Sequence, residues 1–351
     1  MSARSYAIAV ITVAAALFFV VVGTNLLIDP QEVFGTGVVG RSVNANDRYA
    51  RLLEYRANPG GYDSVMFGSS RAFVMPFDEL SRQLGGARLA NFAAVGGTLS
   101  DHVPTLEYLL RDKTARGERL RNVVLELDVD ALGNRPFTNQ GLQYVLPPAI
   151  SGESEARFWW KLLTSIQLKA WQSTLRGSPG AVPLVTGPAA DATSSLRRIV
   201  PDLAQIAGVS RARAQTSQPA AGTAQAGRTR ERITERADFV RQLKLLEHFV
   251  ALCRRHELAL IVMAVPIGRA SADRLDEADL LKAIDQVSDI VPLWDFTVAK
   301  QAIDDPDRWT DGFHFRPELA LMMVRRVFAA EVPQEWRDFG VFKAAQILSS
   351  P

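Results

Sequence analysis

The sequence predicts an α/β fold, in which helices cover a parallel β-sheet, behind one N-terminal membrane-spanning helix. Three observations lead to this fold class. Apolar segments of strand length alternate with segments of helical periodicity in both halves of the chain. An uncharged apolar segment of transmembrane length lies near the N-terminus, and a stretch poor in large apolar residues separates the two halves. Of the 351 residues, 47% are hydrophobic and 22% are charged. This is close to the usage of ordinary globular proteins, so the chain can build a globular core.

The predicted anchor is residues 7–28, which contain no charged side chain over 22 positions. As a helix this segment is about 33 Å long, enough for the roughly 30 Å hydrocarbon core of a bilayer. Arg4 precedes it, whereas Asp29 and Glu32 follow it, so the positive-inside rule places residues 1–6 in the cytoplasm and the rest outside. The alternative is a cleaved signal peptide, but the segment is long for one and no small-x-small site follows it.

The first half of the predicted domain, residues 29–175, holds three strand candidates at 63–67, 89–92 and 122–128. A helix is expected over 99–116, where apolar residues recur at helical spacing. Parallel strands joined by such helices are typical of a sheet with helices packed on it.

Residues 176–236 form the predicted insert, rich in Arg, Ala and Gly and expected to be flexible. It carries eight arginines between Arg197 and Arg236 against three acidic residues. Two interpretations stay open, a solvated linker or a contact with anionic lipid or an acidic polymer.

The second half, residues 237–351, is expected to resume the alternation of helix and strand. Helices are predicted over 238–256, near 272–287 and over 317–330, and strands over 258–265 and 291–296. Without anchor and insert about 260 residues remain, which suits one interrupted domain rather than two.

Composition excludes several classes of function. A net charge of +2 gives no field for wrapping nucleic acid, so no nucleic-acid partner is expected. Cys253 is the single cysteine, which excludes an intrachain disulfide and a zinc site built from several thiolates. His248 and His256 have no common zinc spacing, and no P-loop or dinucleotide fingerprint is present. We therefore expect neither a metal nor a cofactor.

Three loops after predicted strands carry residues suited to chemistry, because reactive groups in open parallel sheets gather where strands end. In the first, Gly68-Ser-Ser-Arg71, a serine hydroxyl can stand at the start of a helix; the plain alternative is a helix N-cap. In the second, residues 91–98, adjacent glycines allow a backbone N–H to approach a ligand, or simply make a flexible turn. In the third, Asp311 and His314 stand three apart, as a base and its orienting carboxylate or as a surface ion pair.

Together the three loops resemble the blocks of the SGNH/GDSL hydrolase superfamily. The resemblance implies a three-layer α/β/α fold, Ser70 as nucleophile with Asp311 and His314 completing the triad, and Asn91 and Gly96 as the second block. It also implies an oxyanion hole made by the N–H groups of Ser70 and Gly96. The third block departs from the family, since Leu127-Asp-Val-Asp130 contains no asparagine.

The anchor followed by Asn25-Leu-Leu-Ile-Asp-Pro30 and a late Trp-Asp-Phe strand is similar to the membrane-anchored bacterial envelope branch, which includes the teichoic-acid D-alanyl transfer protein and the alginate O-acetylation proteins. This resemblance implies a single-pass protein of the inner membrane with a periplasmic domain that transfers or hydrolyses O-acyl groups, in particular O-acetyl groups, on an envelope polysaccharide. A membrane-bound O-acyltransferase is the implied partner. The alternative is a catalytically inactive subunit that binds glycan or assists assembly.

Further residues have weaker functional interpretations. Arg71 could grip an anionic substrate group or be an exposed arginine at a helix start. Asp128 and Asp130 stand at a predicted strand end and could touch substrate, as could Asn91. Asp101 and His102, near the glycine loop, could serve the site or cap a helix.

Overall fold

The computed structural model describes residues 2–36, 42, 44–134, 141–176, 230–297, 304–330, 333–336 and 338–345. They fall into two compact units. We call the described residues before Tyr55, together with 141–176, the anchor unit. The described residues from Tyr55 to Asn134 and from Arg230 onwards are the sheet unit. Residues 177–229, most of the expected insert, lie outside the described residues.

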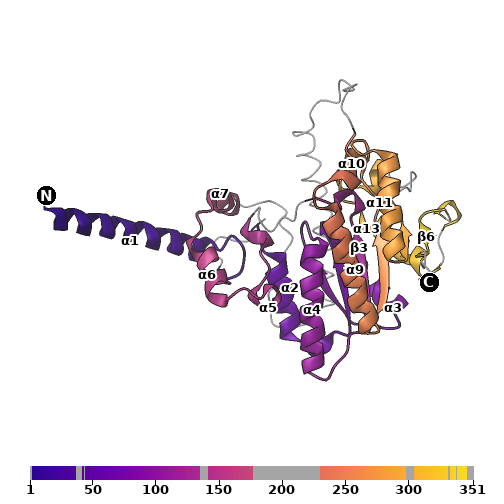
Figure 1. The fold of residues 1–351 in the computed structure, drawn as a ribbon, viewed down its shortest axis with the longest axis horizontal. Coiled ribbons are helices and arrows are strands. Elements are labelled where there is room, and N and C mark those ends of the chain that lie inside the picture. The colour runs from indigo at the N-terminus through magenta and orange to yellow at the C-terminus, as the bar shows by residue number, and fades with distance from the viewer. Residues whose placement is uncertain are drawn as a thin grey trace. The chain divides into compact units, whose positions relative to one another are not determined.

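The anchor unit is helical, and its elements are α1 (Ala3–Ile28), α2 (Asp47–Ala57, which crosses the boundary at Tyr55), η5 (Leu142–Tyr144), α5 (Pro148–Ser151), α6 (Glu155–Thr164) and α7 (Leu168–Arg176). Helix α1 is long and apolar enough to cross a membrane, as predicted, although it begins four residues before the expected start at Ala7. In Figure 1, α6 and α7 lie at the C-terminal end of α1. The small core of this unit contains Val33, Phe158 and Leu162.

The sheet unit is built on six strands in the order β2-β1-β3-β4-β5-β6. Five of them are parallel: β1 (Ser64–Gly68), β2 (Leu89–Ala93), β3 (Asn122–Leu127), β4 (Ala259–Ala264) and β5 (Leu293–Asp295). The predicted α/β class is therefore confirmed. The sheet is mixed rather than wholly parallel, because the short edge strand β6 (Val341–Lys343) runs antiparallel to β5.

Helices pack on both faces of this sheet, because successive strand residues point to opposite faces. One core includes Val65 and Phe67 of β1 and the buried sides of α4 (Leu99–Ala115), α9 (Phe239–Arg255) and α11 (Glu277–Ile290), which lie side by side in Figure 1. The other includes Met66 of β1 and the buried sides of α3 (Phe77–Gln83) and α13 (Pro317–Val327).

Element boundaries differ from the predictions mainly where a cap or a turn ends a helix. The helix expected near 272–287 is two elements, a short α10 (Arg269–Ala272) and α11, because the Asp276 carboxylate accepts a hydrogen bond from Asp279 N–H and starts a new helix. The last residues of the expected insert, 230–236, contain η6 (Ile233–Glu235), whose Ile233 is buried in the sheet unit. The other single turns are η1 (Pro59–Gly61), η2 (Ser70–Val74), η3 (Val129–Ala131), η7 (Pro306–Arg308) and η8 (Gln334–Trp336).

Candidate active site

The nucleophile candidate follows directly on β1, which ends at Gly68. A Cβ on Gly68 would lie 2.5 Å from Glu126 Oε2 and 2.6 Å from Ala72 Cβ, so the turn requires glycine. The next residue, Ser69, is buried and caps η2, since its Oγ accepts a hydrogen bond from Arg71 N–H at 3.1 Å. The N-cap alternative thus holds for Ser69, which leaves the hydroxyl of Ser70 for another role.

The histidine candidate sits in a tight hairpin. Trp309 and Phe315 form an antiparallel bridge, and both side chains are buried in the core of the sheet unit. Thr310 N–H donates to the His314 carbonyl at 2.8 Å and closes the loop. The hairpin is therefore fixed at its base. Asp311 and His314 lie at its tip, between the two bridged residues.

Ser70, His314 and Asp311 are connected by hydrogen bonds. Ser70 Oγ lies 2.9 Å from His314 Nε2, and His314 Nδ1 lies 2.8 Å from Asp311 Oδ2. The geometry suits a neutral imidazole that carries its proton on Nδ1 and accepts from the serine hydroxyl through Nε2. Residues 244 positions apart are thus within direct hydrogen-bonding distance, as a nucleophile and its base need to be.

The Asp311 carboxylate is held ionised. Its Oδ1 accepts hydrogen bonds from the backbone N–H groups of Phe313, at 2.7 Å, and His314, at 2.8 Å. Burial opposes ionisation, but the hydrogen bond from the His314 ring and these two backbone donors outweigh it, so the pKa of Asp311 lies below its usual value. A negative carboxylate at this place stabilises the imidazolium that forms when His314 takes up a proton.

The glycine loop is tied to the serine turn. Ala94 N–H donates to the Gly68 carbonyl at 3.1 Å, and Gly97 N–H donates to the Ala94 carbonyl at 2.8 Å. Gly96 is the third residue of this Ala94–Gly97 turn and has φ +60°, a conformation that favours glycine. Within the described part of the chain, the N–H groups of Ser70 and Gly96 donate to no protein acceptor, so both are available to an oxyanion.

Asn91, the other residue of the expected second block, lies within β2, opposite Met66 of β1. Its Oδ1 accepts from Ala93 N–H at 2.9 Å. Among the described residues no hydrogen bond joins it to Ser70, Asp311 or His314. Its substrate-binding role therefore has no support from these contacts.

Arg71 lies beside the nucleophile but points inward. Its Nη1 donates to Asp128 Oδ1 at 2.8 Å and to Asp130 Oδ1 at 2.7 Å, and its Nη2 donates to Asp130 Oδ2 at 2.8 Å. Its Nε donates to the Phe313 carbonyl at 3.1 Å, next to His314. The interpretation as an exposed helix-start arginine is wrong, since Arg71 is 6% exposed.

These contacts account for Arg71 and Asp128 without a substrate. Burial opposes the guanidinium charge, but Asp128 and Asp130 outweigh it and keep the pKa of Arg71 above its usual value. The role that the contacts support is structural: Arg71 connects the serine turn, the end of β3 and the histidine hairpin. Both aspartates belong to the segment Leu127-Asp-Val-Asp130, which lacks the asparagine that the family resemblance expected.

Glu126, on β3, belongs to the same network and was not among the predicted site residues. Its Oε2 accepts from Ser69 N–H at 2.7 Å. Burial, and then the charge and hydrogen bond of Asp128, raise the pKa of Glu126 well above its usual value. The pKa of Asp128 is lowered, because Arg71 and the hydrogen bonds from Glu126 and Ser69 outweigh its burial. Glu126 is therefore the protonated member of the pair and donates to the Asp128 carboxylate. Glu126 could have been identified from the sequence, because it is an ionisable residue inside the otherwise apolar strand NVVLEL.

The remaining predicted candidate, Asp101, is a helix cap. Its Oδ2 accepts from Thr98 N–H at 2.9 Å and completes a capping box with Thr98 at the start of α4. The capping alternative accounts for Asp101. Its neighbour His102 is buried beside Phe67, with ring centroids 5.4 Å apart.

Each of the three site loops also exposes one large apolar side chain. These are Phe73 in η2, Val95 in the glycine loop and Phe313 in the histidine hairpin, with exposed fractions of 39%, 43% and 43%. Such side chains beside a nucleophile can contact the apolar part of an acyl group.

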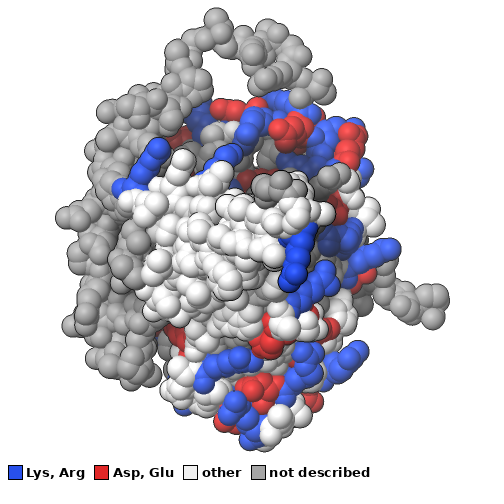
Figure 2. Space-filling view, turned by 90° about the vertical axis from the view of Figure 1, so that its left-hand side faces the viewer, with Lys and Arg blue, Asp and Glu red and all other residues white. Residues whose placement is uncertain are grey.

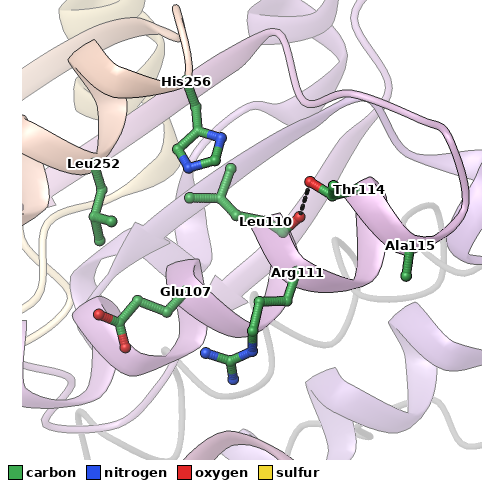
Figure 3. A pocket seen from close by; sticks show the side chains of 7 residues that line it. All are labelled: Glu107, Leu110, Arg111, Thr114, Ala115, Leu252 and His256. Atoms are coloured by element: carbon green, nitrogen blue, oxygen red, sulfur yellow. Dashed lines mark hydrogen bonds between the residues drawn. The ribbon is translucent and has the colours of Figure 1, made fainter.

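A shallow groove elsewhere on the sheet unit, between α4 and α9, is lined by Glu107, Leu110, Arg111, Thr114, Ala115, Leu252 and His256 (Figure 3). Leu110 lies 11 residues, about 17 Å, along α4 from its start next to the glycine loop. The groove is therefore separate from the candidate active site. In the described part of the chain no group of three or more His, Cys, Asp or Glu is arranged to hold a metal ion.

Comparison with known proteins adds no relative to this description. No family model matches the chain, and no curated protein is detectably similar to it in sequence.

Proposed function

We propose that this chain is a membrane-anchored, extracytoplasmic serine acyltransferase or esterase of the SGNH type, acting on O-acyl groups of a cell-envelope polysaccharide. The observation that carries the proposal is the hydrogen-bonded chain from Ser70 through His314 to Asp311. Its position supports the assignment, since Ser70 stands where a parallel strand ends.

The proposed chemistry is acyl transfer through a covalent intermediate. Ser70 Oγ attacks the ester carbonyl while His314 Nε2 takes the hydroxyl proton, and the N–H groups of Ser70 and Gly96 hold the oxyanion. As the ester C–O bond breaks, His314 returns the proton to the departing alkoxide, which leaves an acyl-serine. A sugar hydroxyl or water then loses its proton to His314, attacks the acyl carbon and releases Ser70 with its proton restored.

The substrate class and location rest on the resemblance and on α1. A 26-residue apolar helix with Arg4 on its N-terminal side supports a single-pass anchor in the inner membrane, with the sheet unit in the periplasm. Exposed apolar side chains on the three site loops suit the acyl part of an ester. A membrane-bound O-acyltransferase would supply acyl groups in the proposed arrangement.

The test is labelling of the full-length protein in detergent with a fluorophosphonate probe. We expect Ser70→Ala and His314→Ala to abolish labelling. Ser69→Ala is the matched control because it removes the neighbouring hydroxyl, which caps η2, and leaves that of Ser70 in place. Labelling that persists in Ser70→Ala would refute Ser70 as the nucleophile.

The second candidate is an inactive glycan-binding or assembly subunit. The observation that favours it is the third block, where Asp128 and Asp130 accept hydrogen bonds from Arg71 and provide no oxyanion donor. A folded wild-type protein that is never labelled would support this reading, and binding of envelope polysaccharide by the same preparation would then be the assay.

A further inference from the structure

The helices α6 and α7 of the anchor unit expose large apolar side chains next to the predicted membrane anchor. Trp160 on α6, Ile166 between the two helices, and Leu168 and Leu175 on α7 have exposed fractions of 61%, 68%, 64% and 57%. We propose that α6 and α7 lie in the membrane interface, with these side chains in contact with the lipids of the leaflet at the C-terminal end of α1. This inference rests on α1 as the membrane anchor of the proposed function.

The contact between α6 and α1 fixes the depth of α6. The ring of Trp160 lies beside that of Phe18, with centroids 5.9 Å apart. Phe18 is ten residues, or about 15 Å, before the end of α1 at Ile28. Helix α6 therefore lies alongside the second half of α1 and not beyond its end.

The length of α1 then requires α6 to meet lipid. If the hydrocarbon region ended before it reached Trp160, the spanning part of the anchor would be residues 7–17, which is 11 residues or about 17 Å. That is far short of the roughly 30 Å hydrocarbon core. A segment long enough to span must continue past Phe18, so Trp160 lies at or inside the boundary of the hydrocarbon region.

The side chains fit that position. Leu168 and Leu175 lie seven residues apart on one face of α7, and each is followed in sequence by an exposed basic residue, Lys169 and Arg176. An apolar face bordered by basic side chains is typical of helices that lie in the membrane interface. Tryptophan is likewise enriched there, because its ring is apolar and its N–H is polar.

The polar groups near α1 are satisfied within the anchor unit. Asn25 is fully buried, and its amide donates to the carbonyls of Leu163, at 2.8 Å, and Ser165, at 3.0 Å. Its Oδ1 accepts from Trp171 Nε1 at 2.9 Å. These carbonyls stand at the end of α6, where a helix lacks internal partners. Asn25 thus attaches both helices to α1 and leaves none of these groups unpaired in a region poor in water.

Figure 2 views the molecule from the side that is on the left in Figure 1, so α1 is seen nearly end-on. The middle of that view, where α1 points toward the viewer, is a broad surface without charged side chains, as expected for a segment that contacts lipid. A lipid surface is favoured over a protein partner as the occupant, because the apolar face continues directly from a helix that itself requires lipid.

The test measures how deeply spin labels on the full-length protein lie in phosphatidylethanolamine and phosphatidylglycerol vesicles. The labelled variants are Ile166→Cys, Leu168→Cys and Leu175→Cys. Val240→Cys is the aqueous control, since Val240 is 61% exposed on α9, and Val13→Cys is the lipid control on α1. Cys253 is buried, so the wild-type protein shows any background labelling.

We expect the Ile166, Leu168 and Leu175 labels to collide with oxygen more often, and with a water-soluble nickel complex less often, than the Val240→Cys label. If those labels match Val240→Cys while Val13→Cys is lipid-exposed, the inference is overturned and the anchor stands. If Val13→Cys is also aqueous, the anchor itself fails. Labels that are aqueous in vesicles but protected in native membranes would assign the surface to a protein partner and overturn the inference as well.

Discussion

The substitution Glu126→Gln tests the buried carboxyl pair beneath the nucleophile. In the folded protein Glu126 holds a proton that it donates to Asp128, and it accepts from Ser69 N–H at 2.7 Å. Glutamine has nearly the same shape and can make both hydrogen bonds, since its NH₂ group donates and its carbonyl oxygen accepts. The variant should therefore fold and keep the serine turn in place.

The magnitude follows from proton linkage. Burial and Asp128 raise the pKa of Glu126 in the folded state, whereas in the unfolded chain it is about 4.3. Between these two values the folded state binds the extra proton, so the Glu126 contribution to stability is full below about pH 4 and falls as pH rises. The fall is about 1.4 kcal/mol per pH unit until the pH reaches the folded pKa. Because glutamine loses no proton, the stability of the variant relative to wild type should rise by the same amount per unit.

The assay is guanidinium unfolding of the full-length protein in detergent at pH 5, 6 and 7, followed by tryptophan fluorescence. Wild type and variant are compared at each pH, so that the other titrating groups cancel. Glu247→Gln on the exposed side of α9 is the matched control and should run parallel to wild type. If Glu126→Gln also runs parallel to wild type, Glu126 is ionised in the folded protein and the reasoning fails.

Four further outcomes are expected. Arg71→Lys should slow fluorophosphonate labelling of Ser70 by on the order of 100-fold, because one ammonium group cannot hold Asp128, Asp130 and the Phe313 carbonyl together, and a small displacement of His314 is costly. Gly96→Ala should slow labelling by about 5- to 30-fold, because an alanine at φ +60° is strained by roughly 1–2 kcal/mol and the strain displaces the N–H that it keeps. Asp311→Asn should lower activity by on the order of 10⁴-fold, because the imidazole then adopts the wrong tautomer, while unfolding stability changes little. Asn25→Leu should destabilise the packing of α6 and α7 on α1 by about 1–3 kcal/mol for each carbonyl left unpaired, which hydrogen exchange over residues 155–176 would detect.

The sheet was largely predictable because its strands are short apolar segments between turns. NVVLEL and ALIVMA are nearly continuous apolar runs, which is typical of parallel strands covered on both faces, and parallel pairing follows from the helices between the strands. The edge strand β6 was not predicted, since only three residues pair and two of them are exposed. Helices α6 and α7 were also missed. They are short, at ten and nine residues, and their apolar side chains include exposed ones such as Trp160 and Leu175.

The site was predictable where a loop carries its own sequence signal. Serine after a strand, adjacent glycines and Asp-x-x-His each suggested a role, and hydrogen bonds connect Ser70, His314 and Asp311 in the structure. Arg71 and Glu126 were not understood from sequence, because their roles depend on partners at sequence separations of 57 to 242 residues. An arginine next to a serine is expected on a surface unless buried carboxylates face it, and only the fold shows that Asp128 and Asp130 do.

The carboxylates after β3 also limit how the proposed oxyanion hole can be built. Asp128 and Asp130 are acceptors that hold Arg71, so neither can donate a hydrogen bond to a developing negative charge. The guanidinium itself makes its four hydrogen bonds to Asp128, Asp130 and Phe313, away from Ser70 Oγ. The hole then depends on two backbone donors, at Ser70 and Gly96. With no third donor to compensate, displacement of the Gly96 N–H should affect the rate more than it would in a three-donor hole.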